Sequence, residues 1–302
     1  MYLYNAYGAN ISSYLPISDL LIQEDPDVDI SISKSPSPLE SHIDPAKTYQ
    51  SDITDNGIYL HWPEIGTFCI DKLGERILVD TALEIDPDYI KLAITGPVLA
   101  IAMHLRGNLV LHASGVLIND KVCLFVGPSG AGKSTMLASM LSRGHKLICD
   151  DVAVIRLEGK SSLTLFPGIP RIKLWPDSAE SVNYSGDEIR HLYEGYEKLS
   201  VSCTQDDVVK SSFDRIDQIF CLGVNETVEI RTPTPREGLL ALISNCYVGM
   251  MDKDIAKLRA AEEFKMCSNL AEQTKISVLS RPQNLDLLPD ICALVEREAG
   301  CI

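Results

Sequence analysis

The chain has 302 residues, of which 45% are hydrophobic, so it is long enough to bury a substantial core and is not a disordered protein. Its 42 acidic and 27 basic residues give a net charge of -15, which repels nucleic-acid backbones and anionic membrane surfaces. We therefore expect neither nucleic acid nor a membrane as a partner. A local basic pocket for a nucleotide is still compatible with this charge.

The cysteines and the first residues indicate a reducing compartment. Nine cysteines, an odd number, are scattered without a Cys-x-x-Cys pair or a Cys/His cluster at metal-ligand spacing. Residues 1–5 have neither the basic nor the apolar region of a signal peptide. The longest apolar stretch, about residues 92–105, is interrupted by Gly96 and Pro97 and is expected to be too short to span a bilayer. We expect a soluble, cytoplasmic protein with reduced thiols.

The first part of the chain is predicted to be rich in β-strands. Apolar and polar residues alternate over residues 28–33, which is the period of a half-buried strand. Short apolar runs follow at residues 57–62, 66–70 and 76–79. We predict a small antiparallel β-rich domain over residues 1–98, followed by a catalytic domain over residues 99–302.

After a helical pattern that ends near residue 105, strands alternate with helices. Strands over residues 111–118 and 121–126 are predicted to form a hairpin, and a helix follows over residues 133–142. A buried strand is predicted at residues 146–149. This alternation indicates the α/β fold class.

A Walker A pattern lies between the second strand of this hairpin and the helix. It comprises Gly127, Pro128, Ser129, Gly130, Ala131, Gly132, Lys133, Ser134 and Thr135. The glycines let backbone N–H groups point at phosphate oxygens, and the helix N-terminus adds its positive dipole end. Lys133 is expected to reach the β- and γ-phosphates, and the Ser134 hydroxyl to ligate Mg²⁺. The alternative is a chance glycine-rich turn. The strand before the loop and the helix after it favour a site for ATP or GTP.

A pair of carboxylates, Asp150 and Asp151, ends the strand that follows the Walker A helix. In a P-loop sheet the end of the adjacent strand overhangs the phosphates. One carboxylate can hold the metal there, and the other can accept a proton from an attacking hydroxyl. The alternative is a solvated turn or a helix cap. A P-loop alone does not separate hydrolases, GTPases and kinases, and the acidic pair favours transfer to a hydroxyl.

A histidine, His112, stands at the end of the strand that precedes the P-loop strand. A lone histidine at such a position is more often a hydrogen-bonded structural residue than a catalyst. Both interpretations stay open on the residues alone.

Three segments together resemble the catalytic domain of the HPr serine kinase/phosphorylase family: residues 111–117, 126–135 and 143–151. The likeness covers about residues 100–250, and its order of His, P-loop and Asp-Asp is more specific than the P-loop alone. It implies a compact P-loop fold related to phosphoenolpyruvate carboxykinase, and a homo-oligomer. It also implies that Asp150 is the base for the acceptor serine, that Asp151 supports the metal, and that His112 lies beside the transferring phosphate.

A late arginine and a proline-rich stretch extend the resemblance. Arg236 is similar to the family's arginine before a late helix and is a candidate for stabilising the transferring phosphoryl group, although it can equally be an ordinary loop arginine. Residues 165–177 depart from the signature of the bifunctional enzymes, which leaves phosphorylase activity and HPr as a substrate open. They and residues 4–13 resemble HPr-kinase-like proteins of peptide natural-product pathways, including kinases of lasso-peptide precursors. Within this stretch, Arg171 and Lys173 are candidates for meeting the acceptor, and a structural crossover is the alternative.

These features predict an ATP- and Mg²⁺-dependent kinase that phosphorylates a serine of a peptide or protein. One rival is a kinase of a small-molecule hydroxyl, such as an amino acid or sugar, with the same active site. Another is a nucleotide-gated binding or regulatory protein, which a damaged acidic pair or P-loop lysine would indicate. Neither is damaged here. The sequence identifies neither the acceptor nor the preferred base of the nucleotide.

Overall fold

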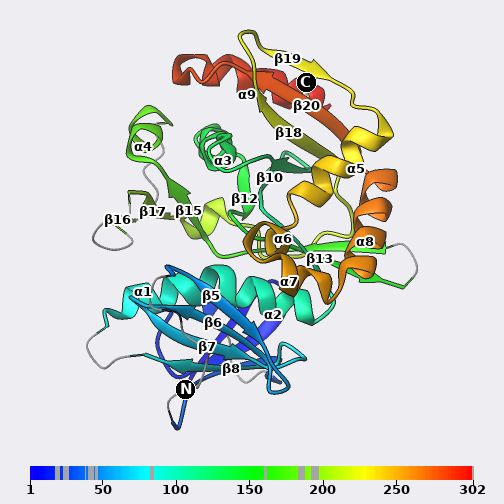
Figure 1. Cartoon of the computed structure of the whole chain (residues 1–302). Coiled ribbons are helices and arrows are strands. Elements are labelled where there is room, and N and C mark those ends of the chain that lie inside the picture. Colours follow the sequence, from blue (N-terminus) through cyan, green and yellow to red (C-terminus); the bar gives the residue numbers. More distant parts are fainter. Residues whose placement is uncertain are drawn as a thin grey trace.

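The computed structural model is a mixed α/β protein, so the predicted class is confirmed. A β-rich lower part and a larger part built on a second sheet are visible in Figure 1. The described residues are 1–17, 21–22, 27–37, 39, 44, 47–81, 85–159, 162–182, 188–191 and 197–300.

The N-terminal part is an eight-stranded sheet in the order β3-β1-β2-β4-β8-β7-β6-β5. Its strands are β1 (Tyr2–Ala6), β2 (Ala9–Ser13), β3 (Leu21–Ile22), β4 (Ile30–Lys34), β5 (Gln50–Ile53), β6 (Ile58–Trp62), β7 (Gly66–Ile70) and β8 (Arg76–Asp80). The β-rich prediction holds, but the expectation of an antiparallel sheet was wrong, because β4 runs parallel to both β2 and β8. A period of two in the sequence shows which side chains are buried and not the direction of the neighbouring strand.

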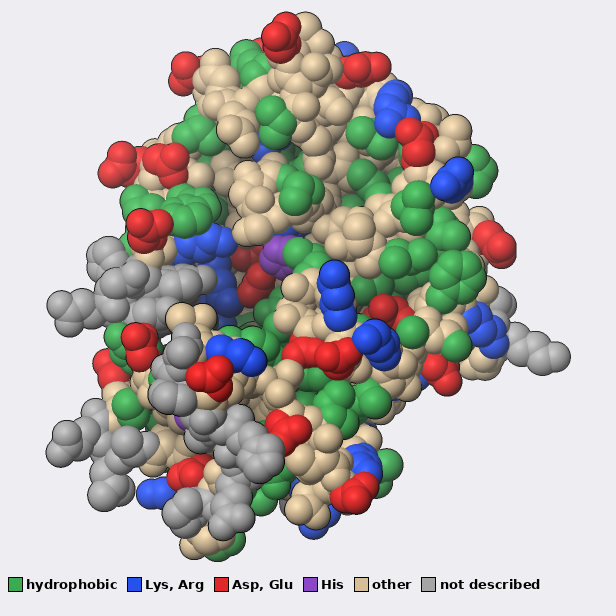
Figure 2. All heavy atoms as spheres, in the orientation of Figure 1, with side chains coloured by type: hydrophobic (Ala, Val, Ile, Leu, Met, Phe, Trp, Pro, Cys, Tyr) green, Lys and Arg blue, Asp and Glu red, His purple; other side chains and the backbone are tan. Residues whose placement is uncertain are grey.

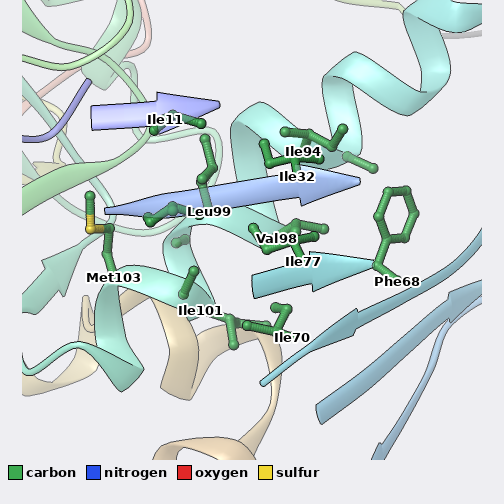
Figure 3. Close-up of a cluster of buried hydrophobic side chains, with 14 of the residues drawn as sticks. Ile11, Ile32, Phe68, Ile70, Ile77, Ile94, Val98, Leu99, Ile101 and Met103 are labelled. Carbon is green, nitrogen blue, oxygen red and sulfur yellow. The ribbon is translucent and has the colours of Figure 1, made fainter. Parts of the chain in front are cut away.

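A helical segment covers one face of this sheet. It consists of α1 (Pro87–Ala93), a π-helical turn at Ile94–Val98 that contains Pro97, and α2 (Leu99–Leu105). Figure 3 shows its apolar side chains meeting those of the sheet, and the labelled contacts are Ile11, Ile32, Phe68, Ile70, Ile77, Ile94, Val98, Leu99, Ile101 and Met103. Both halves of the segment therefore pack on the N-terminal sheet. We propose to place the boundary of the first domain after residue 105 instead of after residue 98.

The same segment has the length and apolar character of a membrane-spanning helix. Its 19 residues, Pro87–Leu105, exceed the stretch expected from the sequence, because the helix starts earlier than the apolar run. Of this helical stretch, 67% is buried inside the protein, and the core helix of a soluble protein can have the same length and composition.

The central sheet has the order β12-β10-β11-β18-β20-β19. Its strands are β10 (Ala113–Ile118), β11 (Lys121–Val126), β12 (Lys146–Cys149), β18 (Gln218–Val224), β19 (Glu229–Arg231) and β20 (Lys275–Arg281). The predicted hairpin is present as the antiparallel pair β10–β11, and β11, β18 and β20 are parallel. We expected the strand before the acidic pair, β12, to lie directly beside the P-loop strand β11. Instead, β10 lies between these two strands. Since β10 is antiparallel to both, β11 and β12 still end at the same edge.

Helices cover both faces of the central sheet. Helices α3 (Lys133–Leu141) and α9 (Leu288–Glu298) pack on one face, and α5 (Pro235–Ser244) and α8 (Ala260–Gln273) pack on the other. Along β11, Cys123 and Phe125 face the first layer, whereas Val122, Leu124 and Val126 face the second. This double burial explains why the strand is an uninterrupted apolar run in the sequence.

The remaining described elements form two small sheets and short helices around the central sheet. One small sheet has the order β14-β13-β9 and the other β15-β17-β16. The bounds are β9 (Leu109–Leu111), β13 (Ala153–Glu158), β14 (Ser162–Phe166), β15 (Arg171–Leu174), β16 (Glu188–His191), β17 (Leu199–Ser202), α4 (Pro176–Val182), α6 (Tyr247–Met251), α7 (Lys253–Lys257), and the 3-10 turns η2 (Gln205–Asp207) and η3 (Leu285–Leu287).

Candidate active site

The P-loop connects the end of β11 to α3, as the sequence predicts. Gly127, Gly130 and Gly132 have backbone φ values of 155°, 81° and 86°, a region that residues with a Cβ rarely adopt. A Cβ on Gly132 would lie 2.2 Å from a terminal nitrogen of Arg281, so any other residue there would also have to displace the end of this arginine side chain. Asn245 fixes the start of the loop, because its side-chain oxygen accepts a hydrogen bond from the Gly127 N–H at 3.0 Å.

Lys133 is buried at the floor of the loop, with 6% of its surface exposed. Its Nζ donates hydrogen bonds to the carbonyl oxygens of Gly127, at 2.7 Å, and Pro128, at 3.1 Å. Burial lowers the pKa of Lys133 to about 8, and the nearby carboxylates of Asp151 and Asp150 only partly oppose this effect. A buried cation of this kind is suited to binding a phosphate, whose charge would replace the lost hydration.

Asp150 is buried and fully engaged with groups around it. Its Oδ1 accepts hydrogen bonds from the hydroxyls of Ser114, at 2.6 Å, and Ser134, at 2.9 Å. Its Oδ2 accepts the backbone N–H of Lys173 at 2.9 Å. The carboxylate is therefore joined to the hydroxyl that the Walker A pattern assigns to the metal. This geometry favours a metal-side role for Asp150 and does not support the expected role as base.

Asp151 instead faces the cavity, next to His112 and Lys173. Its carboxylate lies 3.2 Å from Nδ1 of His112 and 2.7 Å from Nζ of Lys173. Burial disfavours its ionised form, but the Lys173 ammonium and the His112 imidazole outweigh burial and hold the pKa of Asp151 well below its usual range. Its backbone is left-handed, with φ of 71°, which is uncommon outside glycine and is found at functional turns.

His112 is held on two sides. Its backbone N–H donates to the Asn245 carbonyl at 2.8 Å, and its ring stands edge-on to Tyr247. Nδ1 also lies 3.0 Å from the backbone oxygen of Asp151. Because both oxygen neighbours of Nδ1 are acceptors, Nδ1 is the ring nitrogen that carries a hydrogen. Asn245 thus connects His112 with the P-loop, and the sequence pattern gave no sign of it.

A cavity of about 340 Å³ unites these groups. In Figure 2 a hollow contains histidine and acidic side chains beside a group of Lys and Arg side chains. Its lining brings together the predicted His112, Lys133, Asp151 and Lys173 with two cations that sequence reasoning missed, Lys198 and Arg281.

Two predicted arginines lie away from this cavity. Arg236 is exposed in the first turn of α5, whereas the P-loop contacts Asn245 just beyond the other end of that helix, roughly 14 Å away at 1.5 Å per residue. The geometry gives no support to its role at the phosphoryl group. Arg171 is buried, does not line the cavity, and donates to the Thr95 hydroxyl at 2.7 Å, which connects β15 to the π-helical turn.

The oxygen ligands around Ser134 fit Mg²⁺. This ion typically binds one or two carboxylates and substrate phosphates and keeps several waters, so it needs no cage of protein ligands. The Ser134 hydroxyl and the Asp150 carboxylate are adjacent hard oxygen donors of this type. Within the described ranges no group of three or more His, Cys, Asp or Glu side chains could hold a metal.

Comparison with known proteins gives one consistent family. The chain is 44% identical over 50 residues to the HPr kinase/phosphorylase of Chlorobium phaeovibrioides and 43% identical over 51 residues to that of Chlorobium chlorochromatii. The expected resemblance to HPr kinase/phosphorylases is confirmed. Each match covers 17% of this chain and only 15% of the relative. No family model matches.

Among solved structures, the HPr(Ser) kinase/phosphatase from Coxiella burnetii is similar with a TM-score of 0.32 and 17% identity. That likeness covers 63% of this chain and 95% of the other. A TM-score of this size carries no argument, so the α/β description above rests on the strand order and layers of the chain itself.

Proposed function

We propose that this chain is an ATP- and Mg²⁺-dependent kinase that transfers the γ-phosphate to a serine hydroxyl of a peptide or protein. The observation that carries the proposal is the placement of Asp151, His112 and Lys173 beside the P-loop lysine in one cavity. A phosphate-binding loop and an ionised carboxylate that faces the same cavity are what transfer to a hydroxyl needs.

The P-loop and its lysine would bind the phosphates. Loop N–H groups and the α3 N-terminus offer donors and a positive dipole end, and Lys133 adds a buried positive charge. Ser134 and Asp150 would hold Mg²⁺, which when bound neutralises charge on the phosphates. These residues would bind only the phosphates and the metal, so this part of the site does not distinguish ATP from GTP.

Asp151 would act as the base in the transfer step. The acceptor oxygen forms a bond to the γ-phosphorus while the bond from that phosphorus to the bridging oxygen of ADP breaks. The acceptor proton passes to the Asp151 carboxylate. Lys173 and His112 hold this carboxylate ionised and in place. Since the low pKa makes Asp151 a weak base, it would serve mainly to orient the hydroxyl and to take the proton late in the transfer.

The acceptor would enter over the side of the cavity that Lys173, Trp175 and Lys198 line. Trp175 is 41% exposed, and the Lys198 ammonium lies 5.4 Å from its ring centre. An exposed aromatic platform with two cations fits a peptide segment better than a small polar molecule. A cytoplasmic location and a homo-oligomer are also part of this proposal.

Two asparagine variants test the division of work within the acidic pair. We expect Asp151→Asn to lower phosphoryl transfer by about a thousandfold with nucleotide affinity changed little, because only the proton acceptor is lost. Asp150→Asn should raise the Mg²⁺ concentration required for nucleotide binding. Binding is measured by titration calorimetry and transfer by release of ADP.

The matched control is Asp254→Asn, an exposed carboxylate outside the cavity. Transfer by Asp151→Asn at the rate of the parent would remove Asp151 as the base. Loss of transfer in Asp150→Asn with an unchanged Mg²⁺ requirement would restore the role that the sequence resemblance implied.

A further inference from the structure

The P-loop lies in the middle of the central sheet edge, with different residues on its two sides. On one side are β10 and β12, which position His112 and Asp151. On the other side are the carboxyl ends of β18 and β20, where Val224 and Arg281 are direct register partners. Because β11, β18 and β20 are parallel, all three end at the edge where ligands of such sheets bind.

The direction of a bound triphosphate follows from this arrangement. If transfer occurs at Asp151, the γ-phosphate lies on the β12 side, and Lys133 in the centre meets the β- and γ-phosphates. The rest of the nucleotide must then extend away from the acidic pair. The cavity lining continues in that direction over Val224, Arg281, Gln283 and Leu285.

The side chains of this second half have the chemistry of a nucleoside subsite. Val224 is 64% exposed at the end of its strand, and Leu285 is partly buried, so both offer apolar contact to a base. Gln283 is exposed and carries an amide that can donate and accept at a base edge. Most ligand pockets combine apolar walls with a few polar groups in this way.

Arg281 marks the boundary between the phosphates and this subsite. Its side chain is buried, and it donates to the Ala131 carbonyl of the P-loop at 3.1 Å. Its Nη1 donates to the Pro282 carbonyl at 3.4 Å, but its Nε has no hydrogen-bond partner, and among the described residues no carboxylate is seen in an ion pair with it. Burying a cation without an anionic partner costs folding free energy, and a bound anion such as a phosphate would offset this cost.

We propose that Val224, Arg281, Gln283 and Leu285 form the subsite for the base and ribose of the nucleotide, with Gln283 at the base edge. This inference rests on the proposed function, because it assumes that the γ-phosphate lies at Asp151. It assigns base selection to the turn after β20, and it leaves the Trp175 side of the cavity to the acceptor.

The test compares ATP with inorganic tripolyphosphate, which has the phosphates but no nucleoside. For the double variant Gln283→Ala/Leu285→Ala we expect ATP to bind about tenfold more weakly, while tripolyphosphate affinity stays within about twofold of the parent. Both are measured with Mg²⁺ by titration calorimetry. The single variant Gln283→Ala should also change the ratio of ATP to GTP affinity.

The control is the double variant Gln205→Ala/Leu240→Ala, two exposed residues outside the cavity, which should bind both ligands like the parent. An equal loss for ATP and tripolyphosphate, or no loss for either, would overturn the subsite. If the double variant loses ATP affinity but not tripolyphosphate affinity and the parent transfers no phosphate, the proposed function is contradicted while the subsite still stands on its own measurement.

Discussion

The N-terminal sheet and the edge of the central sheet bury different kinds of side chain. In the described residues before the helical segment, the buried polar side chains are uncharged serines and a threonine, Ser12, Ser13 and Thr67. Around the P-loop, by contrast, Lys133, Asp150 and Arg281 are all buried. Apolar burial stabilises the first region, whereas charges at the second cost stability until partners or ligands offset them. We therefore expect substitutions in the first region to change stability and those in the second to change chemistry.

The largest effect is expected for the P-loop lysine. Lys133→Met should lower phosphoryl transfer by about a thousandfold, because it removes the positive charge nearest the transferring phosphate. Its free energy of unfolding at pH 7 should stay within about 1 kcal/mol of the parent, since a buried lysine whose pKa is lowered adds little stability. Transfer assays and urea unfolding measure the two quantities.

The control for this substitution is Lys146→Met, an exposed lysine of β12. A Lys133→Met protein that unfolds several kcal/mol more easily would break the comparison, because the lysine would then be part of the structural core.

The opposite result is expected in the N-terminal region. Leu99 belongs to the helical segment and is fully buried against the sheet. Its replacement by alanine should lower the free energy of unfolding by about 3 kcal/mol. The turnover number of the folded protein should not change. The exposed Leu240→Ala serves as the matched control, with an expected change below about 0.5 kcal/mol. A folded Leu99→Ala protein with strongly reduced turnover would show that this core also positions the site.

A buried charge with complete partners should behave as a structural group. Glu296 accepts two hydrogen bonds from Arg143, at 2.8 and 2.6 Å, and one from His145, at 2.9 Å. Hydrogen bonds from Arg143 overcome burial and, with His145, lower the pKa of Glu296 to about 2. Glu296→Gln should lower the unfolding free energy by about 2 kcal/mol at pH 7.

The sign of the pH dependence follows from the lowered pKa. The contribution of the Glu296 carboxylate is complete above its unfolded pKa of 4.5 and is lost as pH falls from there towards 2. Unfolding of parent and variant at pH 7 and pH 3 should give a smaller difference at pH 3. If the unfolding free energies of parent and variant differed by the same amount at pH 7 and pH 3, the lowered pKa of Glu296 would be contradicted.

The smallest expected effect concerns proton uptake at Lys133. Since its pKa is about 8 and a bound triphosphate favours the charged form, nucleotide binding should take up a proton above that pH. The affinity for the nucleotide should then fall by up to tenfold for each pH unit above pH 8, and it should change little with pH below that value. Calorimetry in buffers of different ionisation enthalpy measures the proton directly. No uptake at pH 9 would show that another group sets the affinity.

The contrast between the regions also explains what the sequence could predict. The P-loop, the strand and helix around it, and the ends of β10 and β12 were predictable, because these features depend on local spacing and apolar periodicity. The parallel β4 and the position of β10 between β11 and β12 were not, because strand pairing is a long-range property.

The same distinction holds within the candidate site. Arg281, Lys198 and Asn245 reach it from distant segments, and no local pattern marks them. The roles of Asp150 and Asp151 depend on which carboxylate meets the Ser134 hydroxyl, a contact that adjacent identical residues do not reveal in sequence. The resemblance to a family supplied the kind of site, and the hydrogen bonds favour the opposite assignment of the pair.

Labelled ATP tests most directly whether this cavity transfers a phosphate to a serine. The protein is incubated with Mg²⁺, ATP carrying a labelled γ-phosphate and serine-containing peptides, with free serine in parallel, and mass spectrometry locates the label. We expect labelled phosphoserine in a peptide, no label in free serine, and loss of the labelled peptide with Asp151→Asn. Bound ATP that remains intact with every acceptor would contradict it and would favour a nucleotide-gated binding protein.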